Sequence, residues 1–425
     1  MMNINNIKKY TTNISWLLLE KIIRLLVGFF VNIWMARYLG PADFGILTFA
    51  QAIIGVFIAF VTLGLGPIIT RDLLLKKYSQ DYLFGTSFVM QFISAILLIL
   101  TIYFYVFFNQ CKENTLILII SFSYIFQIMS MLDSYFQAKL LNKYVAISNG
   151  FAFLISSLAK IFLIIYNYEL IFFAYIAILE SFIIASMYLY FYLKFDSIKR
   201  WKYNSKIARS LLNDSWPLMP HKISMVIIAN IDMLMISKMM DNYSVGIYAM
   251  AYKIYLILIF LASILTKVLF PLLVKNTNNM KMQNTKFIKF YRLMGIVSIF
   301  IIIIYFFVGQ DILKIAFGEQ YRKSIVVLNI LMISVFFSFI NAVCDQWYVI
   351  NNYTKSFLFR TVVGAFINIV LNYFLIAQYG INGAAYATII TMIYISYFSN
   401  FINQKSSKNL HLLNQAFFSI KSKNA

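Results

Sequence analysis

The sequence has 425 residues, of which 62% are hydrophobic and only 12% are charged, and its formal net charge is +21. That much apolar surface exceeds what one water-soluble core could bury, which excludes a soluble enzyme or a soluble nucleic-acid-binding protein. We therefore expect an all-α polytopic membrane protein, because a segment that spans lipid must satisfy its own backbone hydrogen bonds.

Apolar runs long enough to cross a bilayer predict twelve spans. The first six lie near residues 14–36, 44–66, 83–108, 115–135, 146–167 and 170–193. A polar, basic connector over residues 194–214 separates them from six more, near residues 215–239, 246–270, 288–308, 324–350, 357–377 and 383–402. The expected domains are an N-terminal six-helix bundle over residues 1–200 and a C-terminal one over residues 201–425.

The loop cations are unevenly distributed between the two sides of the membrane. Most Lys and Arg residues fall in the loops of one side, which include the connector and Arg360. The other side has few: Arg37, Lys112, Lys238, Lys314, Arg322 and Lys323. Since Lys and Arg mark cytoplasmic loops, both termini are expected in the cytoplasm. This asymmetry explains most of the net charge without a nucleic-acid partner.

The two halves show signs of an internal duplication. Ser15-Trp16 opens the first span and Ser215-Trp216 opens the seventh, and Phe44-Gly45-Ile46 is matched by Val245-Gly246-Ile247. With six spans each, both halves start on the cytoplasmic side. A parallel duplication around a central lumen is therefore expected.

The stretch ARYLGPADFGILTFA, residues 36–50, resembles the start of the polysaccharide-exporting branch of the multidrug/oligosaccharidyl-lipid/polysaccharide superfamily, to which O-antigen flippases belong. The similarity continues through LGLGPIITRDL at residues 63–73 and YGINGAAYAT at residues 379–388. The resemblance implies two parallel bundles that carry an undecaprenyl pyrophosphate-linked oligosaccharide between leaflets of a bacterial cytoplasmic membrane by alternating access. It also implies membrane lipids, a polysaccharide polymerase and a chain-length regulator as partners, and no cofactor.

Ionisable side chains inside spans are the candidate site residues, because each costs about 2.5 to 3.5 kcal/mol at the middle of a helix. Cations lining the lumen could replace the lost hydration of a pyrophosphate. The predicted headgroup ligands are Arg24, Lys222, Lys253 and Lys160. For Arg24 the alternative is a structural ion pair with Glu20, four residues earlier on the same helix face.

Three carboxylates are candidates for binding a coupling ion: Asp232, which the repeat aligns with Asn32, and Glu180 and Asp345. A structural pairing with a neighbouring cation is the alternative for all three. Pro217 and Pro220 predict either a bent gate helix or a simple helix start. No motif indicates a metal site.

Two other functions compete with a flippase. A polysaccharide polymerase or ligase would be an enzyme, but no loop here is long enough for a folded catalytic domain of roughly 50 residues, so we expect no enzymatic activity. A drug or organic-cation antiporter of the same superfamily is disfavoured because lumenal cations would repel its substrates.

Overall fold

The computed structural model describes residues 4–108, 112–274, 280–401 and 404–418, and the regular structure in these ranges is entirely helical. The expected all-α class is therefore confirmed. The contacts divide the chain into two compact units, Met1–Val226 and Ile227–Ala425, and the division falls within helix α10 (Met219–Met239). The sequence-based division after residue 200 stays a prediction about the duplication.

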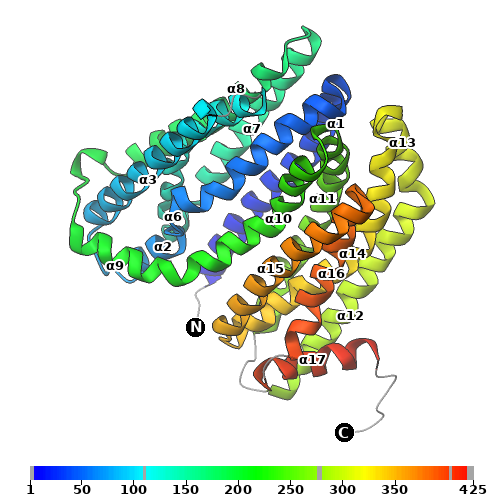
Figure 1. Ribbon diagram of the computed structural model, residues 1–425. Helices are drawn as coiled ribbons and strands as arrows, with labels where there is room; N and C mark the ends of the chain where they lie inside the picture. The colour runs from blue at the N-terminus through cyan, green and yellow to red at the C-terminus, as the bar shows by residue number, and fades with distance from the viewer. Residues whose placement is uncertain (1–3, 109–111, 275–279, 402–403, 419–425) are drawn as a thin grey trace. The chain divides into compact units, whose positions relative to one another are not determined.

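Unit 1 is built from long helices joined by short ones (Figure 1). Its elements are α1 (Ile4–Thr62), α2 (Gly66–Leu74), α3 (Gln80–Phe108), α4 (Lys112–Ser121), α5 (Ser123–Gln127), η1 (Ile128–Ser130), α6 (Met131–Ala138), α7 (Asn142–Ile165), α8 (Leu170–Leu193), η2 (Ile198–Arg200), α9 (Ser205–Ser215) and η3 (Trp216–Leu218), followed by the start of α10. Helix α7 packs against both α1 and α8.

Unit 2 contains the rest of α10 and the C-terminal helices, among which α14, α15 and α16 lie side by side (Figure 1). Its further elements are α11 (Asn242–Val274), α12 (Met280–Ile304), a π-helical turn η4 (Tyr305–Gly309), α13 (Gln310–Phe317), η5 (Glu319–Tyr321), α14 (Arg322–Ile350), α15 (Thr354–Tyr379), α16 (Ile381–Ser396), η6 (Phe398–Phe401) and α17 (Gln404–Phe417).

Within the described ranges, ten helical segments are long and apolar enough to cross a membrane. The longest, Glu20–Leu74, contains two of the expected spans, and α10 occupies the position of the seventh. The remaining segments match the other expected spans in order, so the structure agrees with the predicted twelve-helix pattern. The protein is a multi-pass membrane protein.

The two spans within α1 are separated by a kink at Gly40 and Pro41. Gly40 has a φ of 72°, a left-handed conformation that a side chain disfavours, and Pro41 has no backbone N–H to donate. Together they interrupt the helix where the sequence predicts the first outer loop. The motif at residues 36–50 therefore marks this bend.

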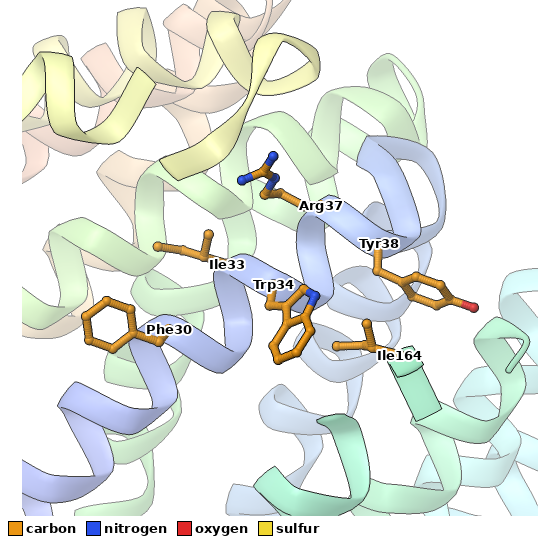
Figure 2. A pocket seen from close by; sticks show the side chains of 6 residues that line it. All are labelled: Phe30, Ile33, Trp34, Arg37, Tyr38 and Ile164. Carbon is orange, nitrogen blue, oxygen red and sulfur yellow. The ribbon is translucent and has the colours of Figure 1, made fainter. Parts of the chain in front are cut away.

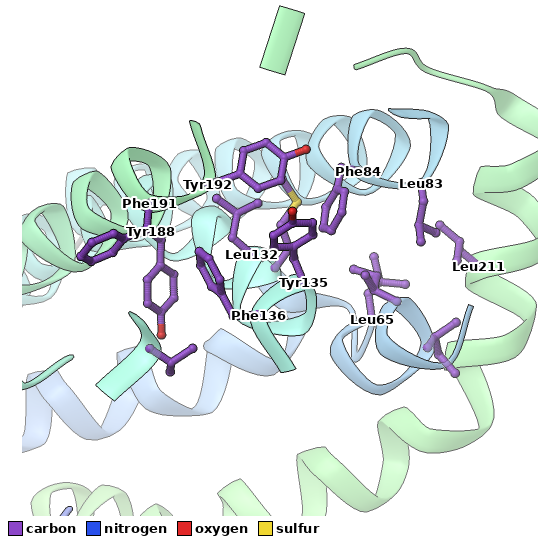
Figure 3. Close-up of a cluster of buried hydrophobic side chains, with 14 residues drawn as sticks. Leu65, Leu83, Phe84, Leu132, Tyr135, Phe136, Tyr188, Phe191, Tyr192 and Leu211 are labelled. Atoms are coloured by element: carbon purple, nitrogen blue, oxygen red, sulfur yellow. The ribbon is translucent and has the colours of Figure 1, made fainter. Parts of the chain in front are cut away.

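A cluster of buried apolar and aromatic residues fills one end of unit 1 (Figure 3). Phe84 of α3 and Tyr135 of α6 both pack edge-on against Tyr192 of α8, with ring centroids 5.9 and 5.1 Å apart. Leu65, directly before α2, and Leu211 of α9 are fully buried in the same cluster. In the predicted topology this is the cytoplasmic end, so the core lies beside the connector.

The connector, expected as a polar loop, contains helix α9. The Asn204 side chain caps its start by accepting hydrogen bonds from the backbone N–H groups of Lys206 and Ile207. Its buried residues, Ala208, Leu211 and Ser215, lie on one helix face. The short apolar stripe explains why a basic segment packs against α2 and α3.

Helix α17 is held against α12 and η6 in unit 2 (Figure 1). The Tyr291 hydroxyl donates to Asn409 Oδ1 at 2.8 Å, and Asn409 donates to Asn400 Oδ1 at 3.0 Å. Arg292 donates to the last carbonyls of α17, Gln415 and Ala416, at 3.0 and 2.9 Å. A cation at a helix C-terminus satisfies carbonyls that have no partner within the helix.

Candidate functional site

The first group of predicted site residues is a charged cluster in unit 1. Arg24 of α1 donates to Glu180 Oε1 of α8 at 2.6 Å and lies 3.9 Å from Glu20 Oε1, so the expected pairing with Glu20 is present. Its guanidinium also lies over the Phe153 ring of α7, 5.4 Å from the centroid. Arg24 is 38% exposed, whereas Glu20 is 6% exposed. The three helices thus converge on one arginine.

Lys160 of α7 is partly buried near this cluster, where its charge is within range of Glu180 and Arg24. Arg24 therefore faces two carboxylates, Glu20 and Glu180, and Lys160 adds a second cation near Glu180. A cavity of about 230 Å³ adjoins Arg24 and Glu20, with walls from α1 and α7: Ile23, Ala146, Ile147, Gly150, Phe151, Phe153 and Leu154. An anion that enters would compete with Glu180 for Arg24.

Lys222 lies apart from this cluster in sequence, at the start of α10. Its Nζ donates to Thr62 Oγ1, at the end of α1, at 2.7 Å. Thr62 Oγ1 also bonds to its own helix, at Ile58 O. Because a hydroxyl leaves the lysine charge uncompensated, Lys222 can still attract a phosphate.

Asp232 is buried in unit 2 and held by neutral donors from three helices. Its Oδ2 accepts from Tyr248 of α11 at 2.5 Å and from Thr388 of α16 at 2.8 Å. Its Oδ1 accepts from Asn372 of α15 at 2.7 Å. Such donors stabilise a carboxylate without cancelling its charge. The site therefore places a buried carboxyl group in a cage of polar side chains.

Two asparagines of α15 add further oxygens beside Asp232. Asn368 lies near Asp232 and donates to Thr391 Oγ1 at 3.3 Å. The amide oxygens of Asn368 and Asn372 are buried and accept no hydrogen bond from any residue in the described ranges. A carboxylate with amide and hydroxyl oxygens is the donor set of a hard cation, and the carboxylate alone could take a proton.

Asp345, the third coupling candidate, has a different environment. It is paired with Arg360 of α15, which is fully buried and also donates to Asn341 Oδ1 at 2.7 Å. The Arg360 guanidinium lies over the Tyr348 ring, 4.7 Å from its centroid. Assigning Arg360 to a cytoplasmic loop was wrong, because the residue is inside the helix packing of unit 2. The pair matches the structural alternative for Asp345.

The remaining predicted site residues lie on α11 and at the start of α10. Lys253 is partly buried on α11, one residue after the buried Tyr252. Pro217 lies in the 3₁₀ turn before α10, and Pro220 lies in the first turn of α10. A helix can accommodate proline in its first turn because the N–H groups there have no partner within the helix. The geometry fits a helix start at these positions.

Sequence reasoning missed the partners that define these sites. Tyr248, Asn372 and Thr388 surround Asp232 but come from helices far apart in the chain. Each is a common polar residue in an apolar run, and no spacing links it to Asp232. The one available signal was that Asn368 and Asn372 recur four residues apart on one face of an apolar helix.

The fold and the apolar helices define a class of protein, the polytopic helical membrane proteins. The lipid II flippase MurJ, solved in an inward closed conformation, has a similar structure, with a TM-score of 0.76 and 18% identity, covering 94% of this chain and 91% of MurJ. An inward-facing multidrug resistance MATE family transporter of the MOP superfamily, the multidrug/oligosaccharidyl-lipid/polysaccharide group named above, gives a TM-score of 0.70 at 14% identity, covering 93% of this chain and 99% of that one. The fold is thus that of the expected superfamily.

Residues 10–277 match the family model described as "Polysaccharide biosynthesis protein", and the chain belongs to that family. The teichuronic acid biosynthesis protein TuaB of Bacillus subtilis (strain 168) is 30% identical over 106 residues, which is 25% of this chain. The match spans 22% of TuaB, about a fifth of its length. The expected resemblance is confirmed, and the structural relatives are named as a flippase and a transporter, not as enzymes.

Proposed function

We propose that the protein flips an undecaprenyl pyrophosphate-linked oligosaccharide from the cytoplasmic to the outer leaflet of a bacterial cytoplasmic membrane. The observation that carries the proposal is the family match over residues 10–277 in a chain with the fold of a lipid II flippase. Both termini lie in the cytoplasm in this proposal, as the loop charges predict. A polysaccharide polymerase and a chain-length regulator would take the product, an O-antigen, capsular or other surface-polymer repeat unit.

In the proposed mechanism, cations replace part of the hydration that the pyrophosphate loses on leaving water. Lys222, whose hydrogen-bond partner Thr62 carries no charge, attracts the headgroup first. Arg24 and Lys160 then bind phosphate oxygens in place of the Glu180 carboxylate. Arginine can donate two parallel hydrogen bonds to one phosphate group. Lys253 supplies a further point charge. Because the carboxylates compete, the headgroup is bound weakly enough to leave.

Coupling to an ion gradient is assigned in the proposal to Asp232. Its cage of neutral donors leaves a full negative charge for a proton or a sodium ion to neutralise. Glu180 and Asp345 are each paired with an arginine side chain. A coupling ion that bound there would have to displace that arginine. Pro217 and Pro220 are the proposed flexible start of α10, the helix that carries both Lys222 and Asp232.

A deletion strain tests the proposal directly. Loss of the protein should cause lipid-linked repeat units to accumulate and surface polysaccharide to disappear, and the wild-type chain should reverse both effects. Lys222→Gln should restore export poorly at normal abundance. Lys238→Gln, which removes an exposed cation from the same helix, is the matched control. A strain that exports normally but becomes sensitive to cationic drugs would instead identify an antiporter.

A further inference from the structure

A second cavity in unit 1, of about 430 Å³, lies beside the end of the first span, directly before the kink at Gly40 (Figure 2). Its lining comes from α1 and α7: Phe30, Ile33, Trp34, Arg37, Tyr38 and Ile164. The volume is within the range of small-molecule sites, about 300 to 1,000 Å³. The predicted topology places this end of the first span at the outer leaflet.

The cavity has an aromatic wall made by one face of α1. Phe30, Trp34 and Tyr38 follow each other at intervals of four residues and therefore align along that face. Phe30 is 67% and Trp34 is 47% exposed, so both rings are accessible. Tyr38 is fixed because its hydroxyl donates to Tyr168 O at 2.9 Å. Two rings of the aromatic wall are therefore accessible, and the third, that of Tyr38, is fixed by a hydrogen bond.

Arg37 adds a positive charge to this wall and is exposed. Outer loops are depleted of Lys and Arg, so an arginine at this end of a span opposes the usual bias and calls for a specific reason. A guanidinium binds phosphate through two parallel hydrogen bonds, and aromatic faces pack against the C–H faces of sugar rings. Both features occur within one cavity.

We propose that this cavity is an exit subsite, which holds the sugar pyrophosphate of the lipid-linked substrate after it reaches the outer leaflet. The inference rests on the proposed flippase function. Arg37 binds the phosphates, and Trp34 stacks on the first sugar. A phospholipid would use Arg37 but has no sugar ring for Trp34, and an acyl chain would use the aromatic wall but not Arg37. The combination therefore favours a sugar phosphate.

Binding in nanodiscs of phosphatidylcholine tests the subsite with three probes: undecaprenyl pyrophosphate bearing one N-acetylglucosamine, the same lipid without sugar, and phosphatidylglycerol. Trp34→Leu should weaken binding of the sugar-bearing lipid at least fivefold and leave the sugar-free lipid unchanged. Arg37→Gln should weaken both at least fivefold. Phe107→Leu and Arg322→Gln, which remove an exposed outer aromatic residue and an exposed outer arginine, should change neither.

Two results would overturn the subsite. One is unchanged binding of the sugar-bearing lipid by both cavity variants, and the other is equally tight, Arg37-dependent binding of phosphatidylglycerol, which would identify a general anionic-lipid site. The flippase proposal is judged separately, by accumulation of lipid-linked repeat units in the deletion strain. A chain that restores export while its Trp34→Leu and Arg37→Gln variants bind normally would refute only the subsite.

Discussion

Asn32 in unit 1 and Asp232 in unit 2 occupy positions that the sequence repeat aligns, yet their surroundings differ. The Asn32 amide donates to Gly28 O of its own helix at 2.7 Å. The Asp232 carboxylate accepts from α11, α15 and α16. Unit 1 concentrates its buried charge elsewhere, in opposed pairs around Arg24. The two positions that the predicted repeat aligns thus hold a neutral amide in one unit and a buried carboxyl group in the other.

The difference suggests a division of labour between the units. In unit 1, Arg24 is paired with carboxylates that an anionic headgroup would displace, whereas the hydrogen-bond partners of Asp232 in the described residues are neutral.

The largest effect is expected for Asp232→Asn, which makes unit 2 resemble unit 1 at the aligned position. Gradient-driven flipping in vesicles should fall at least tenfold, because the variant has no charge for an ion to neutralise. The melting temperature should fall only modestly, since the asparagine oxygen still accepts from Tyr248 and Thr388, although the hydrogen bond from Asn372 is lost. Asp241→Asn, which alters an exposed carboxylate before α11, is the control. Equal gradient dependence in both variants would remove Asp232 from the mechanism.

The next largest effect is expected at the Arg360–Asp345 ion pair of unit 2. Here, in contrast to Asp232, the carboxyl group is paired with an arginine. Asp345→Asn leaves a buried arginine without its anion, which costs about 3 kcal/mol. Thermal unfolding in detergent should show a clear loss of stability. Replacing both residues, Arg360→Met with Asp345→Leu, should recover most of it, because no buried charge remains. If the double variant is as unstable as the single one, the pair has another role.

A smaller coupling is expected between Arg24 and Glu180 in unit 1. A double-mutant cycle with Arg24→Gln and Glu180→Gln should give about 1 kcal/mol in unfolding experiments, because Arg24 is 38% exposed. Glu180→Gln alone should also slow release of the headgroup, since one competitor for Arg24 is lost. Strictly additive single effects would show that the two side chains act independently.

The smallest effect is expected at Asp214 on α9, outside the spans. Its hydrogen bond with Arg71 lowers the pKa of this carboxyl, and Lys77 lies 3.4 Å away. The lowered pKa stabilises the fold above the unfolded value of about 3.9, and this contribution is lost as pH falls through the lower folded value. Asp214→Asn should therefore reduce the melting temperature slightly at pH 6. The difference from wild type should vanish in strong acid.

The sequence predicted the spans well because length and apolarity determine them, and α1 to α8 follow the expected order. It failed where tertiary contacts override local pattern. Arg360 near the start of α15 looks like a loop cation, yet Asp345 from the preceding helix makes its burial tolerable. The connector looks polar, yet Leu211 anchors it in the core. Asp232 was found as a charge in a span, whereas its cage required the fold.

The attachment of α17 has a practical consequence for mapping the topology with reporter fusions. Helix α12 is joined to α17 by the hydrogen bonds of Tyr291 and Arg292. The two helices also pack closely at Gly295, where a Cβ atom would come within 2.6 Å of the Phe417 ring. A reporter fused before residue 404 would remove α17. Tyr291 would then lose its hydrogen bond to Asn409, and the face of α12 that packs against α17 would be exposed. Such fusions would report on a damaged protein, so reporters belong after Ala425 or within loops.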